Sequence, residues 1–298
     1  ALHARRASDG RVVLGFKARR SWRLVEVREC PVADPRIMRA IPALAEVAEP
    51  LLEHPKSAPT LHVTWTLTGL DVDVTGVERR SGGLSRDAQM KAIAAAARAD
   101  LARLSLAGET LVMARQPQVA FGPATVALPA GGFLQAVPEA EAAMVSRAVE
   151  AVQGARKIAD LFCGAGTFTF PLATVAPVIA ADASQAGIEA LRAGVRSAKG
   201  MKAITAEARD LFRRPFTPFD LKGCDAIVFD PPRAGALEQT AQIAGTKAGV
   251  VVGVSCNPQT FARDARLLQD GGYRLIRAVP IDQFRWTHHL EVVASIAR

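Results

Sequence analysis

Lys157-Ile158-Ala159-Asp160-Leu161-Phe162-Cys163-Gly164-Ala165-Gly166-Thr167-Phe168 is the stretch that decides the fold. It reads as a short buried strand that ends in a glycine-rich turn. From about residue 138 onward, helical and strand-like segments alternate, which is typical of a parallel sheet with helices on both faces. We therefore predict a doubly wound, Rossmann-like α/β domain over residues 131–298. Its other elements are expected at 139–153 and 184–198 (helices), at 178–181, 226–229, 250–254, 273–279 and 292–296 (strands), and near Gln259, where another helix begins.

Residues 1–130 show a different pattern, that of a smaller α+β domain. Strands are expected at 12–16, 22–27, 61–67, 70–74, 111–114 and 124–128, with a hairpin about Thr68-Gly69. Ser85 can cap a helix that runs to about Leu104. The apolar face of this helix would consist of Met90, Ile93, Ala97, Leu101 and Leu104. The pattern changes at Gly131-Gly132, where we place the boundary between the domains.

Length and composition exclude several classes of protein. The chain has 298 residues, which favours two domains over one. Hydrophobic residues make up 49% and charged residues 22%, which excludes a disordered tail, a coiled coil or a collagen-like repeat. The longest apolar stretches are shorter than the ~20 residues that span a bilayer. We therefore expect no insertion into a membrane.

The charge of the chain points to an anionic partner. Lys plus Arg number 37 against 29 for Asp plus Glu, a formal net charge of +8. Most of the excess lies within residues 1–39, which contain ten basic and four acidic side chains. Such a segment can displace counterions from a nucleic acid. A solvated basic surface without a partner is the alternative.

The four cysteines, at positions 30, 163, 224 and 256, form no CxxC pair. Neither a disulfide framework nor a self-contained zinc site is indicated, so we expect a reducing, cytoplasmic environment. Cys163 and Cys224 are expected to be packing residues. The chain begins with Ala1 and shows no signal peptide, which favours a piece of a longer protein.

The glycine-rich turn after the first parallel strand suggests a bound nucleotide-like ligand. Gly164 and Gly166 would let a ligand approach the turn, but Thr169 stands where a dinucleotide fingerprint has its third glycine. Asp160, before the glycines, suits a ligand with an amino-acid group better than a pyrophosphate. A tight turn with no ligand would explain two glycines equally well.

Two further carboxylates follow later strands. Asp182 comes about twenty residues after the glycine-rich turn, where a carboxylate can accept both hydroxyls of a ribose. Asp210 follows the next expected strand and could meet an adenine amino group. Together with Asp160, they suggest S-adenosylmethionine as the cofactor.

The ends of three later strands carry the residues for chemistry. The strand at 226–229 runs into Asp230-Pro231-Pro232-Arg233, and two prolines force the chain out of the sheet. Cys256 follows the strand at 250–254 and precedes a helix, whose N-terminus favours a thiolate. Thr287-His288-His289-Leu290-Glu291 brings a carboxylate to the same edge. The two histidines more plausibly position this turn than bind a metal, because no metal-ligand spacing accompanies them.

These motifs occur in a fixed order. They are Asp160 to Phe168, Asp230-Pro231-Pro232-Arg233, Ser255-Cys256-Asn257-Pro258 and His289-Leu290-Glu291, preceded by Phe133-Leu134-Gln135 as an F-x-Q motif. The ordered set resembles the RNA uracil-C5 methyltransferases, particularly the iron–sulfur branch that acts on 23S ribosomal RNA. The resemblance covers essentially the whole chain, and the set is far more specific than any single motif.

The resemblance implies two catalytic residues. Uracil C5 is a weak nucleophile, so the family first adds a thiolate to C6, and Cys256 matches that thiolate. Glu291 matches the base that removes the C5 proton after methyl transfer. The resemblance thus implies S-adenosylmethionine-dependent methylation of a uridine through a covalent cysteine adduct.

Further residues match the family's binding positions. Asp230 would hydrogen-bond the uracil edge, and Arg233 would support Asp230 or a phosphate. Phe133 would pack near the base, and Gln135 would help to bind S-adenosylmethionine. Val137 stands where the family often has Asn, so the polar contact of that Asn is missing and cofactor affinity is expected to suffer.

Cys30, in Glu29-Cys30-Pro31-Val32, resembles the fourth ligand of the family's [4Fe-4S] cluster. The other three cysteine ligands and the N-terminal OB-like domain of the family precede this region, so the cluster is expected only in an intact protein. An ordinary buried thiol is an equally good interpretation of Cys30.

Three functions remain open at this point. We favour methylation of 23S ribosomal RNA by a monomeric enzyme. A uridine in the tRNA T-loop is an alternative target, against which an apparent cluster cysteine argues weakly. The alternative of another class is an RNA-binding module with a degenerate active site.

Overall fold

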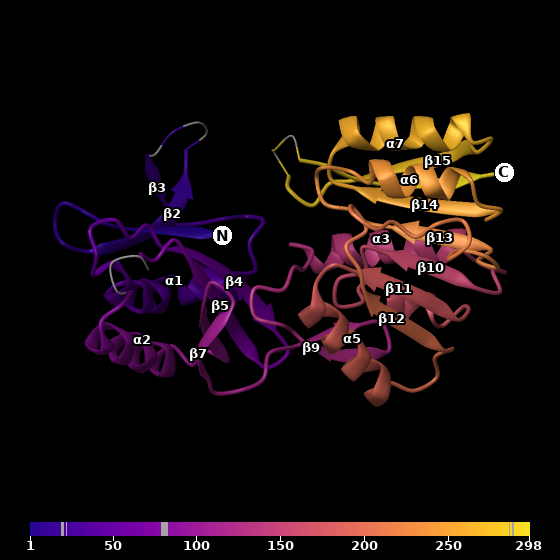
Figure 1. The fold of residues 1–298 in the computed structure, drawn as a ribbon. Helices are drawn as coiled ribbons and strands as arrows, with labels where there is room; N and C mark the ends of the chain where they lie inside the picture. The colour runs from indigo at the N-terminus through magenta and orange to yellow at the C-terminus, as the bar shows by residue number, and fades with distance from the viewer. Residues whose placement is uncertain (19–20, 22, 79–82, 286, 288) are drawn as a thin grey trace. The chain divides into compact units, whose positions relative to one another are not determined.

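The computed structural model of the chain describes residues 1–298 apart from 19, 20, 22, 79–82, 286 and 288. His288 and the first residue of the strand expected at 22–27 therefore lie outside the described part. The chain divides into two compact units. Unit 1 comprises residues 1–119 and 127–131, and unit 2 comprises residues 120–126 and 132–298 (Figure 1). Across the described residues, no helix has the length and apolarity needed to cross a membrane.

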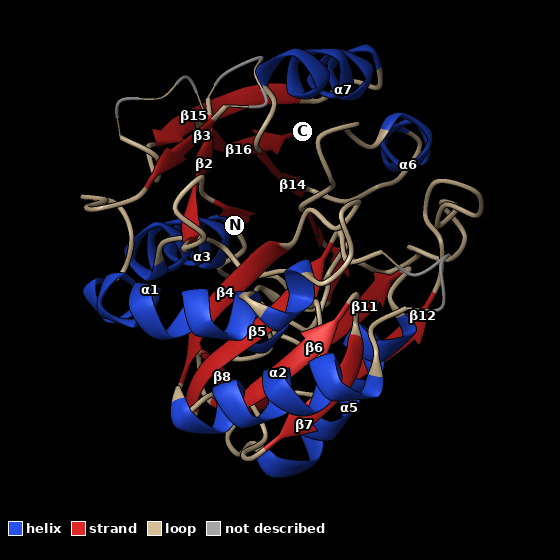
Figure 2. Ribbon diagram, turned by 90° about the vertical axis from the view of Figure 1, so that its left-hand side faces the viewer, coloured by secondary structure: helices blue, strands red, loops and turns tan. Residues whose placement is uncertain are grey.

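Unit 1 contains a seven-stranded sheet of order β3-β2-β1-β4-β5-β6-β7. The strands are β1 Leu2–Arg6, β2 Val12–Lys17, β3 Leu24–Glu26, β4 Thr60–Thr66, β5 Gly69–Thr75, β6 Arg103–Leu106 and β7 Glu109–Met113. Only β5 and β6 pair in parallel, because α2 (Arg86–Arg98) crosses between them. Helix α1 (Pro35–Ala48), which the sequence patterns did not predict, lies beside α2 (Figure 2). The short helix η1 (Pro50–Leu52) follows it.

The hairpin about Thr68-Gly69 is confirmed, since β4 and β5 pair antiparallel. Ser85 caps α2 as expected, by accepting the N–H of Ala88. The predicted end of this helix is wrong. It stops at Arg98, and Asp100 then adopts a left-handed φ of 51° before β6 begins. Tertiary packing explains this early end of the helix, because Leu104 is fully buried as part of strand β6.

The predicted apolar face of α2 is also wrong at Met90. Its side chain is 58% exposed, so it lies on the solvent side of the helix. The buried face consists of Ala88, Ala92, Ala95 and Ala96. These small side chains let α2 pack closely against its neighbours. Within the alanine run at 94–97, only Ala95 and Ala96 are buried, so the predicted face is wrong at the exposed Ala97 as well.

Unit 2 contains the doubly wound sheet, of order β12-β11-β10-β13-β14-β16-β15. The strands are β10 Ile158–Leu161, β11 Val178–Asp182, β12 Ile204–Ala208, β13 Ala226–Phe229, β14 Val250–Ser255, β15 Arg274–Ile281 and β16 Glu291–Ala297. Neighbours from β12 to β14 are parallel, and β16 is antiparallel to β14 and β15. The strands expected in this region are confirmed. A two-stranded sheet, β8 (Gln118–Phe121) with β9 (Ala124–Ala127), precedes them.

The helices of unit 2 are α3 Pro138–Ala151, α4 Thr169–Leu172, α5 Gln185–Ser197, α6 Leu237–Ala244 and α7 Pro258–Asp270. Helices α6 and α7 pack together beside β14 and β15, at the orange and yellow end of the chain (Figure 1). Parallel crossovers are right-handed, so the reversal of strand order at β10 puts the helices of the two halves on opposite faces. Ile243 and Leu268 share one core with Ile227. The reversal at β10 is where such folds bind ligands.

A buried ion pair in unit 1 gives a test of the packing. Arg103 donates to Asp71 from Nε at 2.8 Å and from Nη2 at 2.6 Å, and the two side chains are 4% and 7% exposed. Arg103→Met would leave a buried carboxylate without its partner. We expect the free energy of unfolding, measured by urea denaturation, to fall by about 3–5 kcal/mol.

The matched control is Arg147→Met, which breaks an exposed pair with Glu150. This change should cost less than about 1 kcal/mol. Replacing both buried partners, as in Asp71→Leu with Arg103→Met, should recover most of the loss. Equal losses in the two single variants would contradict the buried character of the Arg103 pair.

Candidate active site

The parallel register aligns the functional turns at one edge of the sheet of unit 2. Leu161 pairs with Ala181 on one side and with Phe229 on the other, and Phe229 pairs with Gly253. The strands therefore end together, and the turns that follow them are neighbours. The predicted residues in this unit are Phe133, Gln135, Asp160, Gly164, Gly166, Asp182, Asp210, Asp230, Arg233, Cys256 and Glu291. Cys30 lies in unit 1.

Cys256 and Glu291 are brought together by the antiparallel pairing of β14 with β16. Ser255 pairs with Val292, and the next residue of each segment along this antiparallel register is Cys256 on one side and Glu291 on the other. The Cys256 side chain is half-buried, whereas Glu291 is only 7% exposed. The structure thus joins a thiol and a carboxylate that are 35 positions apart in the chain.

Two opposing influences act on the Cys256 thiol. Burial and the charge of Glu291 raise its pKa, whereas a hydrogen bond from Arg233 and the charge of that guanidinium lower it. The balance leaves the pKa above the ordinary thiol value, so the resting group is the neutral thiol. Arg233 is the cation placed to favour the thiolate.

The loop after Asp230 is fastened to the start of α7. Asn257 caps α7 by accepting the N–H of Gln259, and its Nδ2 donates to the carbonyl of Arg233 at 3.1 Å. Thr260 Oγ1 donates to the same carbonyl. These bonds fix the backbone of Asp230-Pro231-Pro232-Arg233 relative to Cys256.

The loop is secured a second time by Asp264, which is 2% exposed. Its Oδ2 accepts the N–H of Ala236 at 2.7 Å, and Arg263 pairs with its other oxygen. The side chain of Arg233 in turn reaches the last motif, where its Nη2 donates to Nδ1 of His289 at 2.9 Å. The observed partners of Arg233 are therefore His289 and Cys256, and its support of Asp230 or of a phosphate, which the resemblance implies, stays a prediction. The predicted positioning role of His289 gains a specific contact.

The carboxylic groups of the site have raised pKa values. Burial, then the charges of Glu291 and Asp160, raise the pKa of Asp230 to about 7. Burial also raises the pKa of Glu291, against the smaller effects of a hydrogen bond from Gln283 and the charge of Arg233. Asp230 can therefore donate or accept a proton near neutral pH, and Glu291 is a stronger base than an exposed glutamate.

Asp160 has an unused hydrogen-bonding atom. The residue is fully buried, its Oδ2 accepts the hydroxyl of Thr169 at 2.5 Å, and its Oδ1 has no hydrogen-bond partner among the described residues. Burial raises its pKa to about 7. An unpaired buried oxygen at the end of a central strand is suited to a cationic ligand group such as an ammonium.

The two glycines of the turn differ in their roles. A Cβ on Gly164 would meet no atom within 4 Å, so the space above this residue is open to a ligand. A Cβ on Gly166 would lie 2.6 Å from the Phe170 ring. Close packing against Phe170 and a left-handed φ of 110° therefore both favour glycine at position 166, and its expected role in ligand approach stays a prediction.

Asp182 and Asp210 shape the neighbouring loops. Asp182 accepts the N–H of Gly164 at 3.0 Å and that of Ser184 at 2.7 Å, and each oxygen keeps a second lone pair for a hydroxyl. Asp210 accepts the N–H of Phe212 at 3.0 Å. The Phe212 ring lies 5.4 Å from that of Phe162, whose left-handed φ of 63° marks strain at this edge. The expected roles of Asp160, Asp182 and Asp210 toward the amino group, ribose and adenine of S-adenosylmethionine stay predictions.

Gln283 is a site residue that the motifs did not reveal. It is 5% exposed, and its Nε2 donates to Oε1 of Glu291 at 2.9 Å and to Oε1 of Gln135 at 3.2 Å. Gln135 is thereby linked to the predicted base. Phe133 is 80% exposed, and Val137 sits at the N-cap of α3 without a side-chain hydrogen bond. Only the position of Gln283 just after an expected strand could have drawn attention to it.

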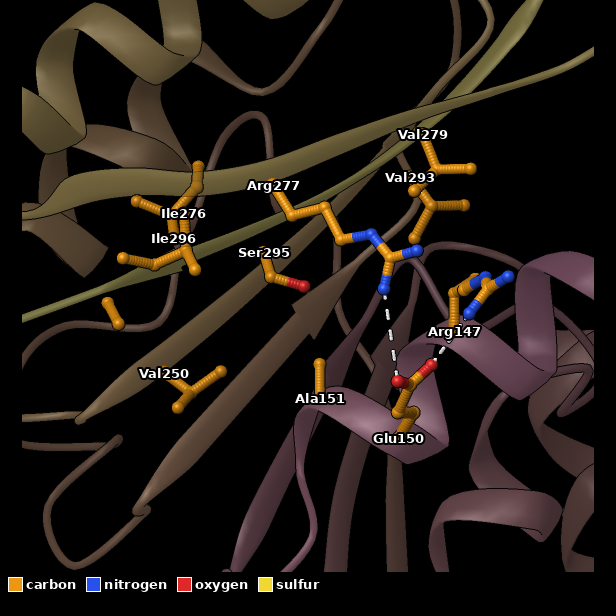
Figure 3. A pocket seen from close by; sticks show the side chains of 11 residues that line it. Arg147, Glu150, Ala151, Val250, Ile276, Arg277, Val279, Val293, Ser295 and Ile296 are labelled. Atoms are coloured by element: carbon orange, nitrogen blue, oxygen red, sulfur yellow. Dashed lines mark hydrogen bonds and ion pairs between the residues drawn. The ribbon is translucent and has the colours of Figure 1, made fainter.

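The remaining thiols and a groove of unit 2 stand apart from this cluster. Cys163 and Cys224 are buried, as expected of packing residues, and Cys30 is half-buried against the core of unit 1. The described residues include no group of three or more His, Cys, Asp or Glu that could hold a metal ion. A groove of about 280 Å³ between α3 and the strands β14, β16 and β15 contains none of the predicted residues. In Figure 3, Glu150 of this groove lies between Arg147 and Arg277.

The raised pKa of Asp230 predicts a specific dependence of stability on pH. An unfolded aspartate has a pKa of about 4. Between about pH 4 and pH 7 the unfolded chain releases a proton that folded Asp230 retains, so this group lowers stability as the pH rises. Asp230→Asn should match the wild type at pH 4 and exceed its free energy of unfolding at pH 8, as measured by urea denaturation.

Asp225→Asn is a control of opposite sign. A hydrogen bond from Arg156 lowers the pKa of Asp225, so this residue stabilises the fold above the unfolded pKa and loses that effect in acid. The variant should be less stable than the wild type at pH 8. A stability gain of Asp230→Asn that is the same at both pH values would contradict the assignment.

Comparison with known proteins places the chain in a family. The family model described as tRNA (Uracil-5-)-methyltransferase matches residues 85–298. An RNA methyltransferase of Caulobacter vibrioides is 61% identical, over 100% of this chain and 72% of the relative. The 23S rRNA (uracil(1939)-C(5))-methyltransferase RlmD of Alkalilimnicola ehrlichii is 33% identical, over 97% of this chain and 67% of the relative.

A solved structure agrees with the family match. The Pyrococcus abyssi tRNA (uracil-54, C5)-methyltransferase, in complex with S-adenosyl-L-homocysteine, superposes with a TM-score of 0.73 and 25% identity. The match covers 99% of this chain and 74% of the other. The strand order and these matches agree. The chain belongs to the tRNA (uracil-5-)-methyltransferase family, the RNA uracil-C5 methyltransferases that depend on S-adenosylmethionine.

Proposed function

We propose that the protein methylates C5 of a uridine in 23S ribosomal RNA through a covalent adduct of Cys256 with C6. The observation that carries the proposal is the register of β14 and β16, which puts the Cys256 thiol beside the Glu291 carboxylate. Uracil-C5 chemistry needs both groups, one to activate the ring and one to complete the reaction.

In the first step, Cys256 adds to the ring. Its thiolate forms a bond to C6, and the electrons of the C5–C6 double bond move toward C4 and O4 to give an enolate. Arg233 favours the thiolate by its charge. Burial raises the pKa of Asp230 to about 7, so its protonated form is accessible near neutral pH and can donate a hydrogen bond to a uracil carbonyl. The enolate carbon C5 is now nucleophilic.

In the second step, C5 attacks a methyl group. S-adenosylmethionine, when bound, supplies an electrophilic methyl group on a sulfonium. C5 would take this methyl group from the sulfonium sulfur, which would keep the electron pair of the broken bond. Asp160 would hold the amino group of the cofactor, Asp182 the ribose and Asp210 the adenine, with Gln135 assisting. This assignment uses the unpaired Oδ1 of Asp160 and the open space over Gly164.

In the third step, Glu291 completes the reaction. Its carboxylate removes the proton from C5, the C5–C6 double bond forms again, and the bond from C6 to Cys256 breaks with its electrons returning to sulfur. A raised pKa makes Glu291 a better proton acceptor. The target uridine must be unstacked for this attack on the ring face, and the exposed Phe133 ring is suited to pack on the base.

Ribosomal RNA is preferred as substrate because the RlmD relative, at 33% identity, acts on 23S rRNA. The second candidate is a tRNA uridine, which the name of the Pyrococcus abyssi structure favours for that protein. The basic side chains of residues 1–39 would serve either RNA by neutralising phosphates. A [4Fe-4S] cluster remains a prediction for a longer protein, since Cys30 alone does not provide four ligands.

The adduct is tested with RNA that contains 5-fluorouridine. Fluorine cannot leave C5 as a cation, so the methylated adduct is trapped and migrates as a larger species in a denaturing gel. Cys256→Ala should form no adduct, whereas Glu291→Gln should form it. On ordinary RNA, Glu291→Gln should release product about 10²–10⁴-fold more slowly, because the general base is lost.

Cys224→Ala is the matched control, since this thiol is buried in the core of unit 2. It should form the adduct as the wild type does. Equal loss of adduct in Cys256→Ala and Glu291→Gln would count against the assigned roles. Wild-type protein that binds RNA but never forms the adduct would instead support a degenerate RNA-binding module.

The identity of the RNA is tested in cells. Mapping of 5-methyluridine in ribosomal and transfer RNA, with and without the gene for the whole protein, should show one modification lost from 23S rRNA. A loss confined to the tRNA T-loop would select the second candidate.

A further inference from the structure

The side-chain amide of Gln283 has one hydrogen-bonding atom, Oε1, that is not satisfied by the described residues. Its Nε2 donates to Glu291 and to Gln135, but its Oε1 is buried and has no hydrogen-bond partner in the described part of the chain. Leaving a buried acceptor unpaired is unfavourable, so native proteins seldom retain one without a reason. Ile281, the last residue of β15, pairs with Glu291 and holds Gln283 at this place.

The two protonation states of Glu291 need opposite partners. The ionised carboxylate only accepts hydrogen bonds, and the Nε2 of Gln283 satisfies it. Once Glu291 has taken a proton, it carries an O–H donor that requires an acceptor. A half-turn of the Gln283 amide exchanges Nε2 and Oε1, which presents the unused oxygen to that donor. Gln135, a second amide, can turn with it.

We propose that Gln283 is a positioning residue for proton removal, which holds the ionised Glu291 by donation and turns its amide to accept from Glu291 once the proton has been taken. The inference rests on the proposed function, since it concerns the C5 proton of uracil. The unpaired Oε1 of Gln283 would then accept the hydrogen bond that protonated Glu291 donates after the third step.

The other groups that face Glu291 come from three segments. Asp230 lies at the end of β13, Arg233 in the loop that follows, and Cys256 before α7. His289, on the segment of Glu291, contacts Arg233. The charge of Glu291 raises the pKa of Asp230 and of Cys256. Gln283 and Arg233 lower the pKa of Glu291, against the larger effect of burial.

The test measures proton removal directly, with RNA that carries tritium at C5 of the target uridine. Tritium release into water is followed over a range of pH in single-turnover reactions. Gln283→Met keeps the length of the side chain but neither donates nor accepts. We expect adduct formation with 5-fluorouridine RNA to persist, tritium release at neutral pH to slow by about tenfold to a hundredfold, and its pH midpoint to rise by about one unit.

Gln283→Lys tests the turning of the amide, because lysine donates but cannot accept. The pH midpoint of tritium release should fall, yet the rate should stay below that of the wild type at every pH. If Gln283→Lys released tritium as fast as the wild type on the high-pH plateau, no acceptor would be needed. That result would overturn the turning of the amide.

Gln239→Met is the matched control for the loss of a buried glutamine. Gln239 is 1% exposed, and its amide bonds both backbone groups of Phe216. This variant should lose stability without moving the pH midpoint. A Gln283→Met variant that loses adduct formation and tritium release equally at every pH, with an unmoved midpoint, would reduce Gln283 to a structural role and overturn the inference.

The failures of the two proposals are distinguishable. Wild-type protein that forms no adduct and releases no tritium from any RNA would contradict the proposed function itself. Wild-type protein that does both, together with a Gln283→Met variant of unchanged pH midpoint, would contradict only the role of Gln283.

Discussion

Strand register is the constraint on which the site depends. Hydrogen bonding between β10, β13 and β14 makes these strands end together, and the antiparallel β16 returns Glu291 to the end of β14. A shift of one residue in β16 would turn every side chain of that strand to the other face. Backbone pairing within a buried sheet therefore brings the end of β14 to the start of β16, and Cys256 follows in the turn between β14 and α7.

The site contains three acidic side chains in a buried environment. Asp160, Asp230 and Glu291 all have raised pKa values, caused first by burial, and the charges of Glu291 and Asp160 further oppose the ionisation of Asp230. Arg233 is the cation that acts on both Glu291 and Cys256. Such an arrangement lowers stability near neutral pH, and in return provides groups that exchange protons at that pH. The hydrogen bonds between α7 and the Asp230 loop keep the arrangement in place.

Local sequence signals were sufficient for most of unit 2. Local sequence determines the short apolar strands and the two prolines after Asp230, so the ends of the strands could be predicted. It also determines the starts of α5 and α7, which Ser184 and Asn257 cap. Long-range effects could not. The early end of α2 depends on the burial of Leu104 in a sheet, and the need for Gly166 depends on the Phe170 ring. The partners of Arg233 and Gln283 lie on segments that only the fold brings together.

The central claim is that the sulfur of Cys256 forms a bond to C6 of a uracil in RNA. Digestion of the trapped RNA–protein complex, followed by tandem mass spectrometry, identifies the peptide that carries the nucleotide. The account predicts a single modified residue, Cys256, in the peptide that includes Ser255-Cys256-Asn257-Pro258. A nucleotide attached to Cys163, or to any residue other than Cys256, would contradict it.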